Sequence, residues 1–212
     1  MKKNILTTLV ACILVAALAV GGTLAYMTAT DSKVTNTFQF ANGMAVDIYE
    51  QLSEAVVDKG QAEVPGTANT GRLTGPDIMN GLNYTNVTPG QTLHKAPRVA
   101  VQTTVDAYVF VKPTAGTNVT IGEIGWTQVG TTGVYYKLIE LGKTDNGITA
   151  YDADNHVYTI DAPIFTTVTI GNVTGGTIGN VEIQVSMIQA AGFNGNAEAA
   201  LAQAPAFQST AG

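Results

Sequence analysis

Histidine side chains are the first residues to examine for chemistry, because imidazole acts both as a general base and as a metal ligand. The chain has two, His94 and His156, and they are far apart in the sequence. A zinc peptidase of the His-Glu-x-x-His type needs two histidines one helical turn apart, and neither histidine has such a neighbour. No serine stands in the Gly-x-Ser-x-Gly turn of many hydrolases, since the serines are Ser32, Ser53, Ser186 and Ser209. We therefore expect no catalytic residues, no metal and no cofactor.

Oxygen-bearing side chains alternate in one short segment, which contains Asp152, Asp154 and Asn155. Calcium loops space their oxygen ligands in this way, so these residues are a calcium candidate. A loop of the EF-hand type also needs Gly at its sixth position and Glu at its twelfth, and both are missing here. A polar β-turn is therefore the favoured interpretation.

Aromatic side chains offer one further kind of site. Tyr108, Trp126, Tyr135 and Tyr136 lie in segments with the apolar pattern of strands. Such residues either line a carbohydrate-binding groove or fill a hydrophobic core, and the core is the commoner role. The sequence leaves both roles open.

The N-terminal residues have the order of a secretory signal peptide. Two lysines directly after the first methionine are followed by a charge-free apolar run over residues 5–20, and then by Gly-Gly-Thr and Ala25. We predict a signal peptide over residues 1–25 with cleavage between Ala25 and Tyr26. The rest of the chain is then secreted, and its location is extracellular.

Two other interpretations of the N-terminus remain. Extended to Tyr26, the apolar run approaches the roughly 20 residues that a membrane-spanning helix needs, which would make it an uncleaved anchor. The letters of residues 9–12 match a lipoprotein motif that ends at Cys12. A lipid-carrying cysteine follows the apolar run instead of standing inside it, which favours the signal peptide. The membrane is then a partner only through the uncleaved signal peptide.

Removal of residues 1–25 would make the chain more acidic and take away its only cysteine, Cys12. The full chain has 10 basic and 16 acidic residues, and the leader holds two lysines and no acidic residue, so the formal net charge changes from −6 to −8. An acidic chain lacks the basic face that binds phosphates, which excludes nucleic acid as a partner. Without cysteine, the exported protein has neither disulfides nor thiol chemistry.

The rest of the chain has the two-residue apolar alternation of β-strands instead of the helical period. We expect strands over residues 35–40, 44–50, 82–87, 98–103, 107–112, 126–129, 134–141, 148–151, 156–160, 164–170 and 181–188. Gly-rich turns separate these segments, and no helical pattern lies between them. This arrangement predicts an all-β protein, a single β-sandwich domain over residues 26–212 with at most short helices.

Two stretches depart from the alternation. Residues 53–80 are rich in Gly, Pro, Ser, Thr and Asn, which predicts a long loop region. Residues 196–203 predict a short helix, because Asn196 has a capping side chain and Pro205 stands where the helix would end.

The leader ends in Gly21-Gly22-Thr23-Leu24-Ala25-Tyr26, which is similar to the leaders cut by the signal peptidase SipW. With this leader, the chain resembles the TasA/camelysin family of exported proteins of Gram-positive bacteria. Further similar segments are residues 35–38, 44–50, 89–90, 107–109, 133–136 and 188–193, together with Lys95, Pro97 and Val99. Phe110 departs from the family pattern, because relatives commonly have arginine there.

The resemblance implies a jelly-roll sandwich whose subunits polymerise into extracellular fibres, with a signal peptidase of the SipW type as a partner. It also implies that the N-terminal strand of one subunit adds to the sheet of the next, and we expect this donor strand within residues 26–40, beginning at Tyr26. Val34, Phe38 and Phe40 share one side of the strand by parity and are expected at apolar positions. The alternative is a tail over residues 26–33 and an ordinary intramolecular strand behind it.

The expected function is that of a secreted structural protein of the cell surface or biofilm matrix, which binds copies of itself and is not an enzyme. Two alternatives remain. Some members of the family have been labelled metallopeptidases, so one alternative is a secreted camelysin-like metallopeptidase. The other is a monomeric surface adhesin or binding domain.

Overall fold

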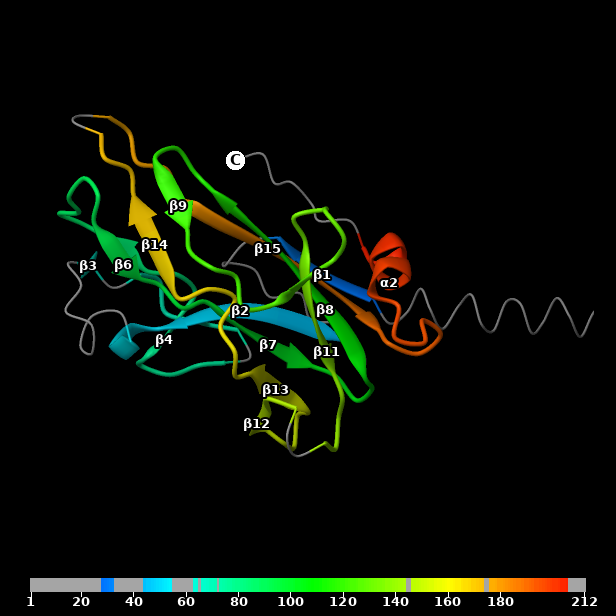
Figure 1. The fold of residues 1–212 in the computed structure, drawn as a ribbon. Helices are drawn as coiled ribbons and strands as arrows, with labels where there is room; N and C mark the ends of the chain where they lie inside the picture. The colour runs from blue at the N-terminus through cyan, green and yellow to red at the C-terminus, as the bar shows by residue number, and fades with distance from the viewer. Residues whose placement is uncertain are drawn as a thin grey trace, which may run out of the picture.

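The computed structural model describes residues 28–32, 44–54, 63–64, 66–71, 73–143, 146–173 and 176–205. These residues form antiparallel sheets and one short helix, which confirms the all-β sandwich predicted from the sequence (Figure 1). The jelly-roll connectivity implied by the family resemblance stays a prediction. Within the described part of the chain, no helix has the length and apolar character needed to cross a membrane.

The first sheet has five strands and places the N-terminal strand at one edge. In spatial order, its strands are β1 (Thr28–Ser32), β15 (Val181–Gln189), β8 (Ala107–Ala115), β11 (Tyr135–Ile139) and β10 (Thr127–Gln128). β8 and β15 pair along nine residues and form the centre of this sheet. β10 and β11 form the hairpin expected across the Gly130–Gly133 turn, where both glycines have positive φ.

The second sheet also has five strands. In spatial order they are β12 (Ile148–Asp152), β13 (Val157–Ile160), β7 (Arg98–Gln102), β2 (Ala45–Gln51) and β4 (Ile78–Met79). The register of the edge strand β12 shifts between Ala150 and Asp152, and such a bulge bends an exposed edge.

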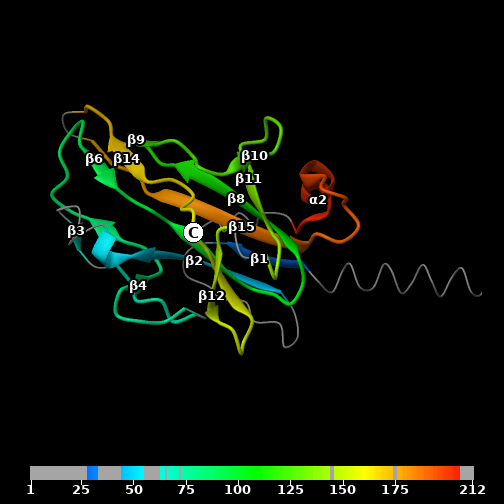
Figure 2. The ribbon, with the colours of Figure 1, turned by 60° about the horizontal axis from the view of Figure 1, so that its bottom comes forward.

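Two smaller sheets complete the molecule. β6 (Thr92–His94), β14 (Thr167–Ile170) and β9 (Val119–Ile121) form a three-stranded sheet in this order, and β3 (Glu63–Val64) pairs with β5 (Asn83–Tyr84). The three-stranded sheet lies at one end of the sandwich, and the helix α2 (Ala197–Gln203) lies at the other (Figure 2).

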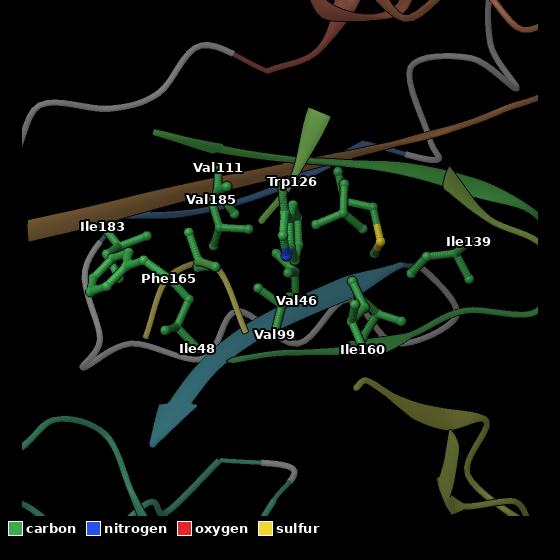
Figure 3. Close-up of a cluster of buried hydrophobic side chains, with 14 of the residues drawn as sticks. Val46, Ile48, Val99, Val111, Trp126, Ile139, Ile160, Phe165, Ile183 and Val185 are labelled. Carbon is green, nitrogen blue, oxygen red and sulfur yellow. The ribbon is translucent and has the colours of Figure 1, made fainter. Parts of the chain in front are cut away.

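The main hydrophobic core fills the space between the two large sheets. Val46 and Ile48 of β2 face Val111 of β8 and Val185 of β15, with Trp126 between the layers (Figure 3). These side chains are at most 4 % exposed. The Trp126 indole donates a hydrogen bond to the Ala162 carbonyl over 3.1 Å, so its one polar group is satisfied inside the core.

The outer faces of both large sheets are covered by the chain itself. On the first sheet, Tyr108 and Phe110 point away from the main core and are buried under Phe193 and α2. On the second sheet, Tyr49 is buried with Leu73, which is fully buried and belongs to the loop between β3 and β4. Each β-strand at the centre therefore has apolar residues on both faces.

The helix agrees with the sequence-based prediction at both ends. The Asn196 side chain accepts a hydrogen bond from the Ala199 N–H over 3.0 Å and caps the helix, which ends before Pro205. The strands β6 and β9 were not predicted, because each is only three residues long. Within residues 53–80, the described residues contain the two-residue strands β3 and β4, with loop between them.

Candidate functional site

The candidate site is the edge at which β1 pairs with β15. The strands are antiparallel, with Thr28 opposite Ile188, Thr30 opposite Ser186 and Ser32 opposite Gln184. β1 is the last strand of its sheet, so its ladder runs to β15 alone. The chain therefore places part of the predicted donor segment on its own sheet.

β1 and β15 differ strongly in composition. β1 reads Thr-Ala-Thr-Asp-Ser and has no large apolar residue, whereas β15 contributes Ile183, Val185 and Met187 to the main core. Burial of apolar surface is the main source of stability, at about 25 cal/mol per Å². The contact that the structure shows for β1 is its ladder with β15, whereas β15 is also anchored in the core.

The C-terminal segment crosses β15 on the side away from the main core. The Ser186 hydroxyl is fully buried and donates a hydrogen bond to the Pro205 carbonyl over 3.0 Å. Ile188, two residues further along, packs in the cluster under α2. This segment therefore covers the outer side of β15 around Ser186 and Ile188.

Several predicted residues of this site lie outside the described residues. They are Ala25 and Tyr26 of the predicted cleavage point, and Val34, Phe38 and Phe40 of the predicted donor segment. The expectations for them stay predictions.

The calcium candidate forms a turn between β12 and β13. The Asp152 carboxylate accepts hydrogen bonds from the Asn155 backbone over 3.2 Å and from the Asn155 side-chain amide over 2.8 Å. These bonds lower the pKa of Asp152 from its ordinary value. Among the described residues, no three His, Cys, Asp or Glu side chains lie close enough together to hold a metal ion. This geometry is that of the polar β-turn favoured from the sequence.

The two histidines lie in different parts of the fold. His94 is in β6 of the three-stranded sheet, and its carbonyl accepts a hydrogen bond from the Tyr84 hydroxyl over 2.7 Å. His156 is exposed in the β12–β13 turn and has a φ of 55°, which suits a turn position.

The aromatic candidates fill cores. Trp126 is in the main core, and Tyr135 packs against its edge. Tyr108 lies in the cluster under α2, 6.0 Å from the Phe110 ring and 5.9 Å from the Tyr136 ring. Phe110 is fully buried there. Tyr135 and Tyr136 are half-buried beside these clusters, and the carbohydrate-binding groove stays an alternative.

Two polar clusters were not found from the sequence. Lys95 lies 2.8 Å from both carboxylate oxygens of Glu50, and Arg98 binds Glu54 through two nitrogens at 2.6 and 2.9 Å. Both pairs join residues more than 40 positions apart, so no local spacing could reveal them. They tie the end of β2 and the residues after it to Lys95, which precedes β7, and to Arg98, its first residue.

Comparison with known proteins gives no match, because no protein-family model, no curated protein and no solved structure is significantly similar to this chain.

Proposed function

We propose that this chain is a secreted structural subunit that assembles into cell-surface or matrix fibres by exchanging β1 between copies. The observation that carries the proposal is an edge strand without large apolar residues, paired with a strand that the core fixes in place. The predicted leader and the resemblance to the TasA/camelysin family support the same function. No cofactor and no catalytic group is part of this mechanism.

Exchange costs little enthalpy, because β1 of a neighbour makes the same main-chain ladder with β15 as the chain's own β1. A released β1 would leave the β15 edge unpaired, and unpaired edges recruit other strands. The donor strand and the acceptor edge are different surfaces of one subunit. The contact is therefore head-to-tail and extends into a fibre unless the geometry closes a ring.

The leader would control the start of assembly. Thr28 is the third residue after the predicted cleavage point, so an uncleaved leader would tether β1 close to the membrane. We expect cleavage between Ala25 and Tyr26 to free the strand, and N-terminal sequencing of the secreted protein tests the position.

A disulfide across the β1–β15 register tests the exchange directly. Thr30 and Ser186 are opposite each other, and neighbouring antiparallel strands hold such pairs within the range of a disulfide. In the double variant Thr30→Cys/Ser186→Cys, strand exchange would link successive copies covalently. Non-reducing electrophoresis is then expected to show a ladder of multimers that collapses on reduction, and electron microscopy to show filaments.

A matched control uses a pair of strands that belong to one hairpin. Thr149 and Thr159 are opposite each other in β12 and β13, so Thr149→Cys/Thr159→Cys should give disulfide-linked monomers only. If Thr30→Cys/Ser186→Cys also gives only monomers, with no filaments, the exchange proposal is wrong and a monomeric binding domain becomes the better interpretation.

A further inference from the structure

Three described segments at one end of the sandwich contain no ionisable residue. They are residues 85–93, residues 113–122, and residues 166–173 with 176–181, and we call them the uncharged end. Charged residues make up 12 % of the whole chain, yet these segments contain no Asp, Glu, Lys, Arg or His. The charged residues and the histidine that directly flank these segments in the sequence are His94, Lys112, Glu123 and Glu182, and they stand at the border of the uncharged end.

Main-chain hydrogen bonds join the three segments into one surface. The Gly90 N–H donates to the Ile170 carbonyl over 3.1 Å, and the Gly171 N–H donates to the Asn118 carbonyl over 2.8 Å. The Gly179 backbone lies so close to Thr117 that a Cβ atom there would be 2.5 Å from its nitrogen. β6, β14 and β9 accordingly lie together at the end of the molecule opposite α2 (Figures 1 and 2).

The outward face of the three-stranded sheet presents a row of hydroxyl groups. Thr169 of β14 is directly opposite Thr92 of β6 on one side and Thr120 of β9 on the other. The Thr92 and Thr169 hydroxyl oxygens are 3.0 Å apart, and Thr92 and Thr120 are exposed. Neighbouring strands are about 4.8 Å apart, so the row is regular. Beside this sheet, Ile178 is 39 % exposed and adds an apolar contact.

This face differs from the outer faces of the two large sheets. Phe193 and α2 cover part of one of those faces and Leu73 packs on the other, whereas Thr92 and Thr120 remain exposed on the small sheet. Uncharged hydroxyl and methyl groups are cheaper to desolvate than charged side chains, and interface centres are depleted of charge. The uncharged end therefore has the composition of an interface.

The partner that fits best is a second copy of the same chain. Every copy carries a formal net charge of −6, so two copies repel each other over most of their surface. An isologous contact between two uncharged ends brings no like charges together. A charged partner would instead need complementary charges, which this surface lacks. We propose that two copies of this chain associate through their uncharged ends. This contact is independent of β1, so it stands or falls separately from the strand exchange proposed above.

Sedimentation velocity over a concentration series tests the contact, using the protein purified from its producing cells. The chain is expected to show a concentration-dependent dimer that added salt does not weaken, because no ion pair holds it. The double variants Thr92→Glu/Thr120→Glu and Thr92→Lys/Thr120→Lys should each raise the dimer dissociation constant about 100-fold or more, since both place like charges in the contact. The lysine variant is decisive because the two interpretations predict opposite results for it. It lowers the net negative charge of each copy, so it would strengthen an association that is limited only by overall repulsion. It would weaken a dimer that buries Thr92 and Thr120.

Matched controls carry the same changes away from the uncharged end. Thr127 in β10 and Thr149 in β12 are exposed threonines on other strands, so Thr127→Lys/Thr149→Lys and the corresponding glutamate pair should leave the dimer unchanged. Thermal unfolding of each variant verifies that it folds. If the Thr92/Thr120 variants do not fold, the single variant Thr120→Cys with a flexible thiol cross-linker replaces them, because the only native cysteine lies in the predicted leader.

Four results would overturn the proposal: a wild-type chain that is monomeric at every concentration, an equal loss in the control variants, a lysine variant that dimerises as tightly as wild type, or no cross-linking of Thr120→Cys above that of Thr149→Cys. The proposal would also be wrong if the Thr92/Thr120 variants dimerised like the wild type but were no longer retained on a neutral polysaccharide. That result would assign the surface to glycan binding. Multimers of Thr30→Cys/Ser186→Cys are scored separately, so failure of one contact is distinguishable from failure of the other.

Discussion

Replacing Lys95 by methionine should destabilise the fold strongly, because it leaves the Glu50 carboxylate buried without its counter-ion. The Glu50 side chain is 4 % exposed and that of Lys95 is 12 % exposed, and the ammonium group also lies 5.6 Å from the centre of the Tyr84 ring. The Glu50 carboxylate also accepts a hydrogen bond from the Leu82 N–H over 3.0 Å, and this bond remains in the variant. One backbone N–H does not replace a full positive charge.

The size of the effect follows from the geometry. At 2.8 Å and an effective dielectric constant of about 20, the attraction between two unit charges is about 6 kcal/mol. Desolvation of both groups offsets part of it, and removing one partner of a buried pair costs about 3–5 kcal/mol. We therefore expect Lys95→Met to lower the free energy of unfolding by about 3–5 kcal/mol. The double variant Glu50→Gln/Lys95→Met should recover a large part of this loss, because no unpaired charge remains.

Urea denaturation at neutral pH measures these changes as shifts of the midpoint at constant slope. The exposed pair of Lys143 and Glu140 supplies the control, since their side chains are 57 % and 34 % exposed. Lys143→Met should change the free energy of unfolding by less than about 1 kcal/mol. A loss below about 1 kcal/mol for Lys95→Met, or a double variant no more stable than the single one, would refute the reasoning.

Three further predictions concern other parts of the fold. Leu73→Ala should lower the free energy of unfolding by about 2–5 kcal/mol in urea, because Leu73 is fully buried where its loop covers the second sheet. Asn196→Ala should cost about 1 kcal/mol in the same assay through loss of the cap of α2, and Asn196→Asp should retain the cap. Burial, which outweighs the opposing influence of Arg98, raises the pKa of Tyr49 above its ordinary 10.0. The stability that the neutral Tyr49 phenol contributes is therefore present below about pH 10 and is lost as the pH rises through the higher pKa of the folded state. Phenylalanine does not titrate, so the unfolding temperature of Tyr49→Phe should depend less on pH in this window than that of the wild-type chain.

The strands of the two large sheets were predictable because their apolar residues alternate. Residues 44–50 and 107–112 were predicted as strands, and the structure contains β2 and β8 at these places. In β8, however, Val109 faces the main core while Phe110 faces the cluster under α2. A strand buried on both faces loses its polar side, so the sequence does not reveal what covers the second face.

The covers themselves were not predictable from local pattern. Leu73 stands in a segment dominated by turn residues, and only the tertiary fold brings it onto Tyr49. The pair of Lys95 and Glu50 is equally non-local, since it joins the residues beside two different strands. Short strands were missed for another reason, because β9 pairs over only three residues and its alternation is too brief to distinguish from a loop.

The candidate site was predictable only as a segment. A donor strand was expected within residues 26–40, and the described part of that range forms β1. The strand that pairs with β1 was not predicted, because β15 lies about 150 residues further along the chain and pairing partners across such a distance leave no local signal.

The distribution of covered and exposed surfaces favours assembly through edges and ends of the sheets over stacking of their faces. Phe193 and α2 cover apolar residues on the outer face of one large sheet, and Leu73 covers Tyr49 on the other, which disfavours flat stacking of these faces between copies. The bulge in β12 bends a further edge away from the regular geometry that pairing needs. The two contacts proposed above use other surfaces of the described residues: the edge that β1 occupies, and the uncharged end. If both act, β1 would extend a fibre and the uncharged ends would join neighbouring fibres. Loss of the β1 contact should then abolish filaments, whereas charges at Thr92 and Thr120 should leave single filaments and abolish bundles.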